Sequence, residues 1–550
     1  MVKIRFPIRK GLFYGALPDA AAQVGECDLV PEAGVTMDDK AIFVGGGGET
    51  TREAQLLHLG FGNRHGLIAG ATGTGKTITM QILAEEFSNA GVPVFLTDIK
   101  GDCGGIAMPG TPRGGLERRA EQIGLAGYGY RESPVIFWDF FGEHGHPVRA
   151  TIAELGPLLL SRMLDLTEAQ EGVINVAFRI SDDEGLPILD LKDLRAILNF
   201  LGENQREISV QYGNVTTQSI GAIQRKLLVL ENQGATHFFS EPALELSDFM
   251  RVAPDGRGYI SILHAERLMR TPRLYATFLL WLLSQLFEEL PEVGNPDKPK
   301  LVFFFDEAHL LFNNAPRALV EKVERVARLI RSKGVGVYFV TQNPDDVPDT
   351  VLGQLGNRVQ HALRAFTARD QQALRRAAQT YRPNPRFDIG DAIRDVGVGE
   401  AVTSFLEDKG NPGMAERTMI RPPSSQMGPI EDGQRQMLML RSPVAGKYEQ
   451  MIDSDSAHEI LARRAEAAAR EAEAALTSVD AEQERAREFN NARRYEPSMP
   501  RSRTPAKSPG RSSRRDTPVD AFAKSLARQM GSRTGQALMR GVLGGLLKGR

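Results

Sequence analysis

The sequence predicts an α/β fold, in which helices cover both faces of a mainly parallel sheet. Two observations carry this prediction. Short apolar runs of strand length alternate with helical patterns from about residue 60, and one such run leads directly into a glycine-rich loop followed by a helix. The expected strands span residues 67–69, 94–97, 135–138, 259–263, 301–305, 336–341 and 401–405.

The segments around this sheet have different patterns. Before it, strand-like pieces at 11–15 and 41–44 are separated by turn signals, which predicts a small β-rich N-terminal cap. A long helical segment interrupts the sheet, and since structureless loops of that length are improbable in a compact domain, we expect a helical insertion. The expected boundaries are 1–55 for the cap, 56–150 and 258–450 for the two halves of the core, and 151–257 for the insertion.

Beyond residue 450 the composition changes twice. Residues 451–490 are rich in Ala, Glu and Arg, which predicts exposed helices, and Pro, Ser and Arg then dominate 491–519, the composition of a disordered basic linker. Apolar residues such as Met539 and Leu543 return at helical spacing in 520–550, which predicts a basic amphipathic C-terminal helix. Such a helix can dock on a partner protein or a sister subunit; its few positive charges make membrane contact the less favoured alternative.

The net charge of −2 hides an uneven distribution, because residues 491–550 carry fourteen Lys and Arg against three acids. A basic tail on an acidic body is typical of a partner-binding arm, and the acidic body gives no bulk electrostatic case for nucleic acid. Cys27 and Cys103 lack metal-ligand spacing, so we expect a reduced, cytoplasmic location without structural zinc. The longest apolar stretch, 274–287, predicts a buried helix because it is too short for a bilayer span.

A phosphate-binding pattern, G-x-x-x-x-G-K-[ST], follows the first expected strand of the sheet. Its glycines let the backbone curl so that successive N–H groups converge on phosphate oxygens, and the helix that follows adds the positive end of its dipole. Lys76 would reach the β- and γ-phosphates of a nucleoside triphosphate such as ATP, and the hydroxyl of Thr77 would bind Mg²⁺. The residues of the pattern are Gly70, Ala71, Thr72, Gly73, Thr74, Gly75, Lys76 and Thr77.

Two acids follow the apolar run 301–305, at the edge of the sheet where open α/β folds bind ligands. Asp306 would hold Mg²⁺ through water, and Glu307 would polarise the attacking water. Adjacent acids after a strand are also common as helix caps. Together with the phosphate loop, we interpret this pair as the catalytic half of an ATPase site.

Other polar residues follow neighbouring strands. Gln342, after the run 336–341, would sense the γ-phosphate, although it could also be an ordinary loop amide. Asp98, after the run 94–97, would contribute to the nucleotide and metal site, and capping of the following turn is the alternative.

Basic residues that follow the acids at 306 and 307 offer candidates for an arginine finger, a side chain that completes the site of a neighbouring subunit. Arg328, Arg331 and Arg358 are the candidates, and the sequence does not choose among them. The alternative is a solvated basic helix face, because the apolar residues around Val326 occupy the opposite face.

The phosphate loop, the acids at 306 and 307 and the segment 340–344 together resemble the HerA–FtsK group of P-loop ATPases. The segments 63–66, 98–102, 137–139 and 145–147 resemble more closely a bacterial family of HerA-like helicases and domains of unknown function. The resemblance spans about 50–455. It implies a RecA-like core, ATP hydrolysis at subunit interfaces, and hexameric rings that pump double-stranded DNA, with Lys76 and Thr77, Asp306 and Glu307, and Gln342 in the family's catalytic positions.

Two functions of different class therefore remain open. The first is a Mg²⁺-dependent ATPase that forms a ring and moves along DNA. The second is an ATP-driven remodelling or scaffold protein that acts on a protein or membrane partner through the insertion and the basic tail. A nucleotide-binding protein without hydrolysis is a third, against which the pair at 306 and 307 counts.

Overall fold

The computed structural model describes residues 40–312 and 317–493, and within them the strands form one large sheet. The strands are β1 (Ala41–Gly47), β2 (Glu53–His58), β3 (Gly66–Ala69), β4 (Val94–Asp98), β5 (Val135–Asp139), β6 (His146–Pro147), β7 (Ile260–His264), β8 (Leu301–Phe305), β9 (Val335–Thr341), β10 (Asn357–Gln360), β11 (Glu400–Ser404) and β12 (Glu416–Ile420). Their order is β2-β1-β12-β11-β10-β3-β9-β8-β4-β7-β5-β6.

The sheet is parallel from β10 to β6 and antiparallel from β10 back to β2. Each of the seven expected strands is present and begins and ends within one residue of its expected limits. The predicted α/β class is therefore confirmed. The strand expected at 41–44 corresponds to β1, which pairs with β12 and so continues this same sheet.

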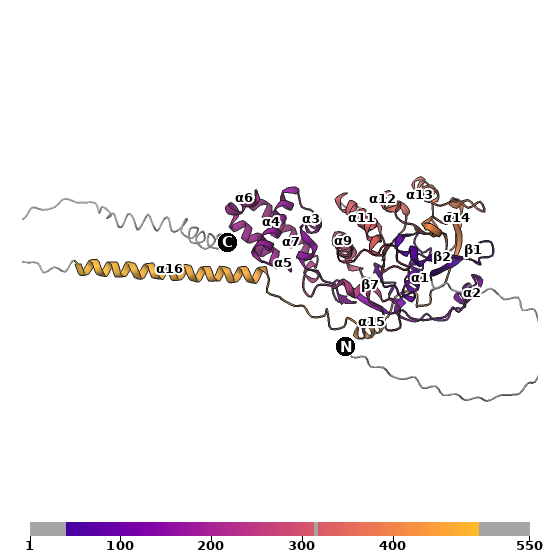
Figure 1. Ribbon diagram of the computed structural model, residues 1–550, viewed down its shortest axis with the longest axis horizontal. Helices are drawn as coiled ribbons and strands as arrows, with labels where there is room; N and C mark the ends of the chain where they lie inside the picture. Colours follow the sequence, from indigo (N-terminus) through magenta and orange to yellow (C-terminus); the bar gives the residue numbers. More distant parts are fainter. Residues whose placement is uncertain (1–39, 313–316, 494–550) are drawn as a thin grey trace, which may run out of the picture.

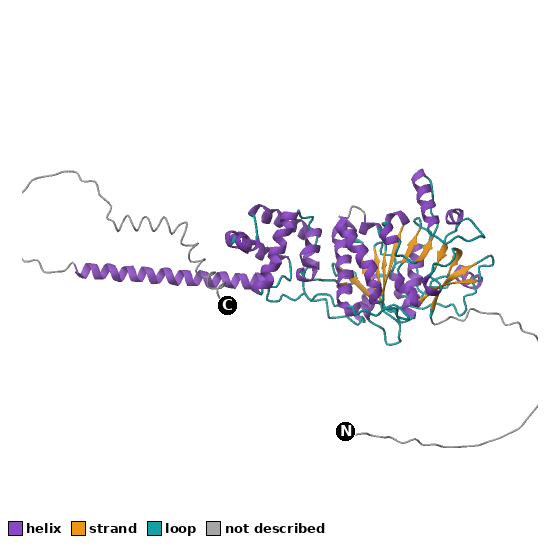
Figure 2. Ribbon diagram, turned by 45° about the horizontal axis from the view of Figure 1, so that its top comes forward, coloured by secondary structure: helices purple, strands orange, loops and turns teal. Residues whose placement is uncertain are grey.

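Helices pack on both faces of the sheet (Figure 2). The α-helices of the described residues are α1 (Lys76–Asn89), α2 (Gly114–Gln122), α3 (Ile152–Met163), α4 (Glu168–Glu184), α5 (Leu191–Glu203), α6 (Gln205–Tyr212), α7 (Thr217–Asn232), α8 (Ala235–Phe238), α9 (Pro272–Glu289), α10 (His309–Phe312), α11 (Arg317–Leu329), α12 (Asp349–Leu352), α13 (Ala368–Gln379), α14 (Ile389–Asp395), α15 (Asp432–Leu440) and α16 (Ala457–Arg493).

Side-chain alternation along the strands builds two cores. In β3, Leu67 joins the core that contains α9 and α11, whereas Ile68 joins the core that contains α1. Phe303 and Phe304 in β8 divide in the same way. This alternation follows from the period of two in a strand, and it anchors the phosphate-loop strand and the acidic strand in the same packed layers.

The apolar stretch at 274–287 forms the buried helix α9, as predicted. Its side chains pack in the same core as Leu67 and Phe303. Among the described residues, no helix has both the length and the hydropathy that crossing a bilayer requires.

The segment between β6 and β7 is helical, and Figure 1 shows α3 to α7 gathered beside the sheet. Its core merges with the core that contains α9. The helix α16 contacts α5 and then extends away from the rest of the chain (Figure 1). The division of the chain into domains stays a prediction.

Three sequence predictions fall on residues that the structure does not describe. They are the strand-like piece at 11–15, the basic linker from residue 494 onward, and the amphipathic helix at 520–550.

Candidate active site

The phosphate loop connects β3 to α1, as the motif requires. The backbone φ angles of Gly70, Gly73 and Gly75 are 152°, 78° and 117°, a region that favours glycine because a Cβ atom is strained there. A Cβ atom on Gly70 would also lie 2.5 Å from the Cβ atom of His361. The first glycine of the loop is therefore required both by its conformation and by its close neighbour.

Hydrogen bonds to the strands beside it hold this loop open. The Ala71 N–H donates to the Ala362 carbonyl at 2.8 Å, and the Gly399 N–H donates to the Thr74 carbonyl at 3.1 Å. The Ala71 carbonyl accepts from the Thr74 hydroxyl at 2.7 Å and from Lys76 Nζ at 3.1 Å. The loop is thus fixed by the segment after β10, by the residue before β11 and by its own side chains, which favours a preformed site.

This arrangement suits an anion. The α1 helix begins at Lys76, so the positive end of its dipole faces the loop. Burial and the nearby charge of Lys100 lower the pKa of Lys76, which indicates that two ammonium groups lie close together here. Thr77 is half-buried in the first turn of the same helix.

The acidic pair lies at the same edge of the sheet as the phosphate loop. The strands β3, β9 and β8 are consecutive and parallel, so residues that follow them meet at one edge. The charges of Asp306 and Glu307 act on Lys76 across this edge. The structure therefore brings together the two motifs that the sequence predicts to cooperate.

Asp306 is buried and held by its backbone. Its N–H donates to the Thr97 hydroxyl at 3.0 Å, and its Oδ1 accepts the Glu307 N–H at 2.9 Å. Burial raises the pKa of Asp306 to about 7; Lys100 opposes that rise, and the Glu307 charge adds to it. Mg²⁺ prefers hard oxygen donors, so the Asp306 carboxylate and the Thr77 hydroxyl form a donor set that fits this ion.

Glu307 accepts from Lys100 and Gln342, lies beside His309 and has a strained backbone. Lys100 Nζ lies 2.7 Å from Oε1, His309 Nδ1 lies 3.3 Å from Oε2, and Gln342 Nε2 lies 3.3 Å from both oxygens. Burial acts to raise the pKa of Glu307, but Lys100, Gln342 and His309 together outweigh it and lower the pKa. A φ of 46° is rare for a glutamate, and such strain occurs mostly at functional sites.

Gln342 follows β9 and hydrogen-bonds Glu307, so its side chain reaches the site. Asp98 is the last residue of β4, at the same edge, but both of its oxygens accept backbone N–H groups, from Gly101, Asp102 and Cys103 at 2.8 to 3.1 Å. It therefore caps the turn that carries Lys100, which is the alternative that the sequence left open. A contact from Asp98 to the nucleotide stays a prediction.

The arginine candidates lie away from this edge. Arg331 lies in the short helix Ile330–Lys333 before the amino end of β9, which places it opposite the phosphate loop within its own chain. Arg358 donates to the carbonyls of Leu352, Leu355 and Thr380, and a role at a neighbour's site would require these bonds to break. Arg328 is exposed on α11. None of these positions can act in its own subunit's site without rearrangement.

Two residues of the site carried no prediction. Lys100 lies inside the segment 98–102 that supports the family resemblance, and a lysine two residues after a strand end was the available signal. His361 is buried against the phosphate loop and follows β10, whose sequence Asn-Arg-Val-Gln has no strand-like apolar run. No local sequence pattern therefore identifies His361 as a residue of the site.

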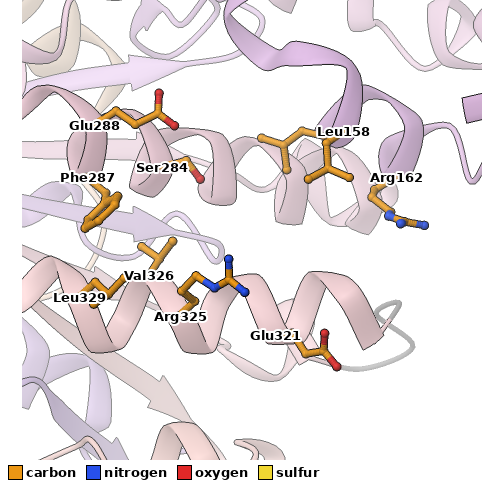
Figure 3. A pocket seen from close by; sticks show the side chains of 10 residues that line it. Leu158, Arg162, Ser284, Phe287, Glu288, Glu321, Arg325, Val326 and Leu329 are labelled. Carbon is orange, nitrogen blue, oxygen red and sulfur yellow. The ribbon is translucent and has the colours of Figure 1, made fainter. Parts of the chain in front are cut away.

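A groove of about 380 Å³ opens elsewhere, between α3, α9 and α11 (Figure 3). Apolar side chains such as Leu158, Phe287 and Leu329 line it, with Glu321 and Arg325 at its border. No residue of the phosphate loop and neither acid after β8 lines it.

Comparison with solved structures gives likenesses at low identity. The bacterial conjugative coupling protein TrwB is 15% identical, with a TM-score of 0.42, over 70% of this chain and 92% of that one. VirB4 of Thermoanaerobacter pseudethanolicus is 14% identical, with a TM-score of 0.45, over 70% of this chain and 97% of that one. Such low values say nothing about what this chain binds. No curated protein matches it.

The family comparison is more decisive. The model of the helicase HerA-like C-terminal family matches residues 47–550, which include strands β2 to β12, the phosphate loop and the acidic pair. The predicted resemblance to HerA-like P-loop ATPases is thereby confirmed. With this match and a site built as that of a P-loop nucleoside triphosphatase, the chain belongs to the helicase HerA-like C-terminal family.

Proposed function

We propose that this protein hydrolyses ATP in a Mg²⁺-dependent reaction. The observation that carries the proposal is the convergence, at one edge of the sheet, of the phosphate loop after β3 and the acids after β8. A loop that only bound phosphate would not need a second, buried carboxylate pair beside it.

Each side chain has a role in this reaction. The loop amides and Lys76 hold the phosphates and stabilise the charge that develops during transfer. Thr77 and Asp306 would hold Mg²⁺, which neutralises charge on the β- and γ-phosphates when bound. Glu307 orients the attacking water, and Gln342 reports whether the terminal phosphate is present, because it already contacts Glu307.

Substitution of Lys76 tests the proposal. The Lys76→Ala variant should lose at least tenfold in ATP affinity and about a hundredfold or more in turnover, because the ammonium that contacts the phosphates is gone. Lys298→Met is a matched control, because Lys298 donates to carbonyls of Ala90 and Gly91 at the far end of α1. Equal turnover in wild type and Lys76→Ala would overturn the assignment.

We further propose that the protein is a homo-oligomeric motor, with a hexameric ring favoured, that moves along double-stranded DNA in the cytoplasm. The family supports this, and Arg331, which lies at the edge of the sheet opposite the phosphate loop, would complete the site of a neighbouring subunit. Light scattering with and without ATP and duplex DNA measures the mass; a monomer under every condition would contradict the ring.

Duplex DNA should stimulate ATP hydrolysis, and the stimulation should weaken as salt rises from about 50 to 200 mM because phosphate contacts release counterions. The alternative function is remodelling of a protein partner, engaged through the basic C-terminal tail, with a membrane as the less favoured target. Its supporting observation is the acidic composition of the body. Intact basal hydrolysis without stimulation by DNA would favour this alternative.

A further inference from the structure

Lys100 follows β4, the strand beside β8 and its acidic pair. Asp98 caps the turn around it through three backbone N–H groups, so the backbone of Lys100 is fixed while its side chain takes no part in that cap. Its Nζ lies 2.7 Å from Glu307 Oε1, and its side chain is 40% exposed. A rigid base thus carries a partly exposed, movable ammonium group.

The charges around Lys100 are those of a polyanion site. The charge of Lys100 helps to lower the pKa of Lys76, after burial, because like charges repel. Asp306 and Glu307 offset this repulsion in part. Lys76, at the start of α1, and Lys100, two residues after β4, therefore both lie at the edge where the phosphate loop would hold a triphosphate.

The ion pair with Lys100 is one of several contacts that occupy the Glu307 carboxylate oxygens. Glu307 also accepts from Gln342 and faces His309, so its oxygens already have donors before any water arrives. The Lys100 side chain is 40% exposed, so solvent screens its ion pair with Glu307, whereas a triphosphate brings more negative charge than one carboxylate. A bound triphosphate would therefore compete successfully for the Lys100 ammonium.

We propose that Lys100 is a second triphosphate-binding lysine that pairs with Glu307 in the empty site and moves to the terminal phosphate when a triphosphate binds. The move frees a Glu307 oxygen for the attacking water. This inference rests on the proposed ATPase function and adds a contact that distinguishes triphosphate from diphosphate.

Nucleotide affinity of Lys100→Met tests the inference directly. Because Lys100 would contact only the terminal phosphate, the affinity for a non-hydrolysable ATP analogue should fall about 10- to 100-fold, while the affinity for ADP should change less than about twofold. Lys100→Arg should restore most of the triphosphate affinity, and Lys298→Met should change neither affinity.

Lys100→Gln provides a second variant, because it keeps a donor for Glu307 without the charge and should show the same triphosphate-selective loss. Equal losses for both nucleotides, or no loss for either, would overturn the role of Lys100. If the wild-type protein hydrolyses ATP but Lys100→Met keeps its preference for the triphosphate, only the role of Lys100 is wrong. Wild-type protein without turnover removes the proposed function, whereas a selective loss in Lys100→Met would still support the binding role.

Discussion

The Thr79 hydroxyl donates to Nε2 of His361 across 2.8 Å, and Nδ1 of the same ring lies 2.8 Å from the Glu400 carbonyl. Since a carbonyl can only accept, the tautomer with hydrogen on Nδ1 satisfies both contacts. The ring thereby connects the first turn of α1 with the chain after β10 and with β11. The phosphate loop is held in place by an uncharged histidine.

Folding stability should decrease at acidic pH because of this ring. Burial first, and then the Lys76 charge, lowers the pKa of His361 to about 4, below its ordinary value near 6.5. Since the unfolded chain binds the proton more readily, stability is complete above pH 6.5 and is lost as the pH falls toward 4. Denaturant titrations should show His361 contributing a loss of about 2 kcal/mol between pH 7 and pH 5.

The variant His361→Asn isolates that contribution, because Asn can keep the hydrogen bond to Glu400 but does not titrate. Its free energy of unfolding should decrease less between pH 7 and pH 5 than that of the wild type. Part of the decrease should remain, since burial also lowers the pKa of His65 to about 4. Identical pH dependence in both proteins would contradict the account of His361.

Gly70→Ala should disrupt the phosphate loop. The new methyl group would lie 2.5 Å from the His361 Cβ atom, and the φ of 152° at this position is strained for alanine. The loop must therefore move. We expect a loss of about 2–4 kcal/mol in stability or a tenfold or larger loss of ATP affinity. The control is Gly115→Ala in α2, where a Cβ atom meets open space. Unchanged melting and ATP affinity in Gly70→Ala would refute the close approach.

Thr97→Val should weaken the acidic edge without adding volume. The buried Thr97 hydroxyl accepts from the Asp306 N–H at 3.0 Å and from the Tyr275 hydroxyl at 3.1 Å. Valine leaves both donors unpaired, which costs about 1–3 kcal/mol each and should lower turnover by moving Asp306. Thr97→Ser keeps the oxygen, so it should retain most activity. If both variants have equal turnover and stability, these hydrogen bonds do not position Asp306.

Glu307→Gln should separate nucleotide binding from hydrolysis. Glutamine cannot polarise water as a carboxylate does, so turnover should fall about 10²- to 10³-fold while ATP stays bound with near wild-type affinity. Filter binding and phosphate release measure the two quantities. Glu292→Gln changes an exposed glutamate before β8 and should leave both unchanged. Loss of ATP binding in Glu307→Gln would instead indicate a structural role for Glu307.

The sequence predicted the sheet well where strands are apolar on both faces. Leu301–Phe305 and Val335–Thr341 are continuous apolar runs, and both were identified within one residue. The strand β10 was missed because only Val359 in Asn357–Gln360 is apolar. Its place beside β3 depends on long-range pairing, which no local pattern reveals.

The candidate site divides in the same way. Lys76, Asp306 and Glu307 follow from local motifs, because each motif fixes its own backbone and side chains. His361 contacts Thr79 across 282 positions of sequence, so local reasoning could not connect them. The sequence allowed two roles for Asp98, a contact to the nucleotide site or a cap of the following turn. The three backbone N–H groups that donate to its carboxylate favour the cap.

Phosphate release by the purified wild-type protein, with Mg²⁺ and ATP, measures directly whether this chain hydrolyses ATP. We expect continuous turnover that stops when EDTA removes the metal and that is lost in Lys76→Ala. ATP that binds with measurable affinity but is never cleaved, with Mg²⁺ present and with duplex DNA added, would contradict it.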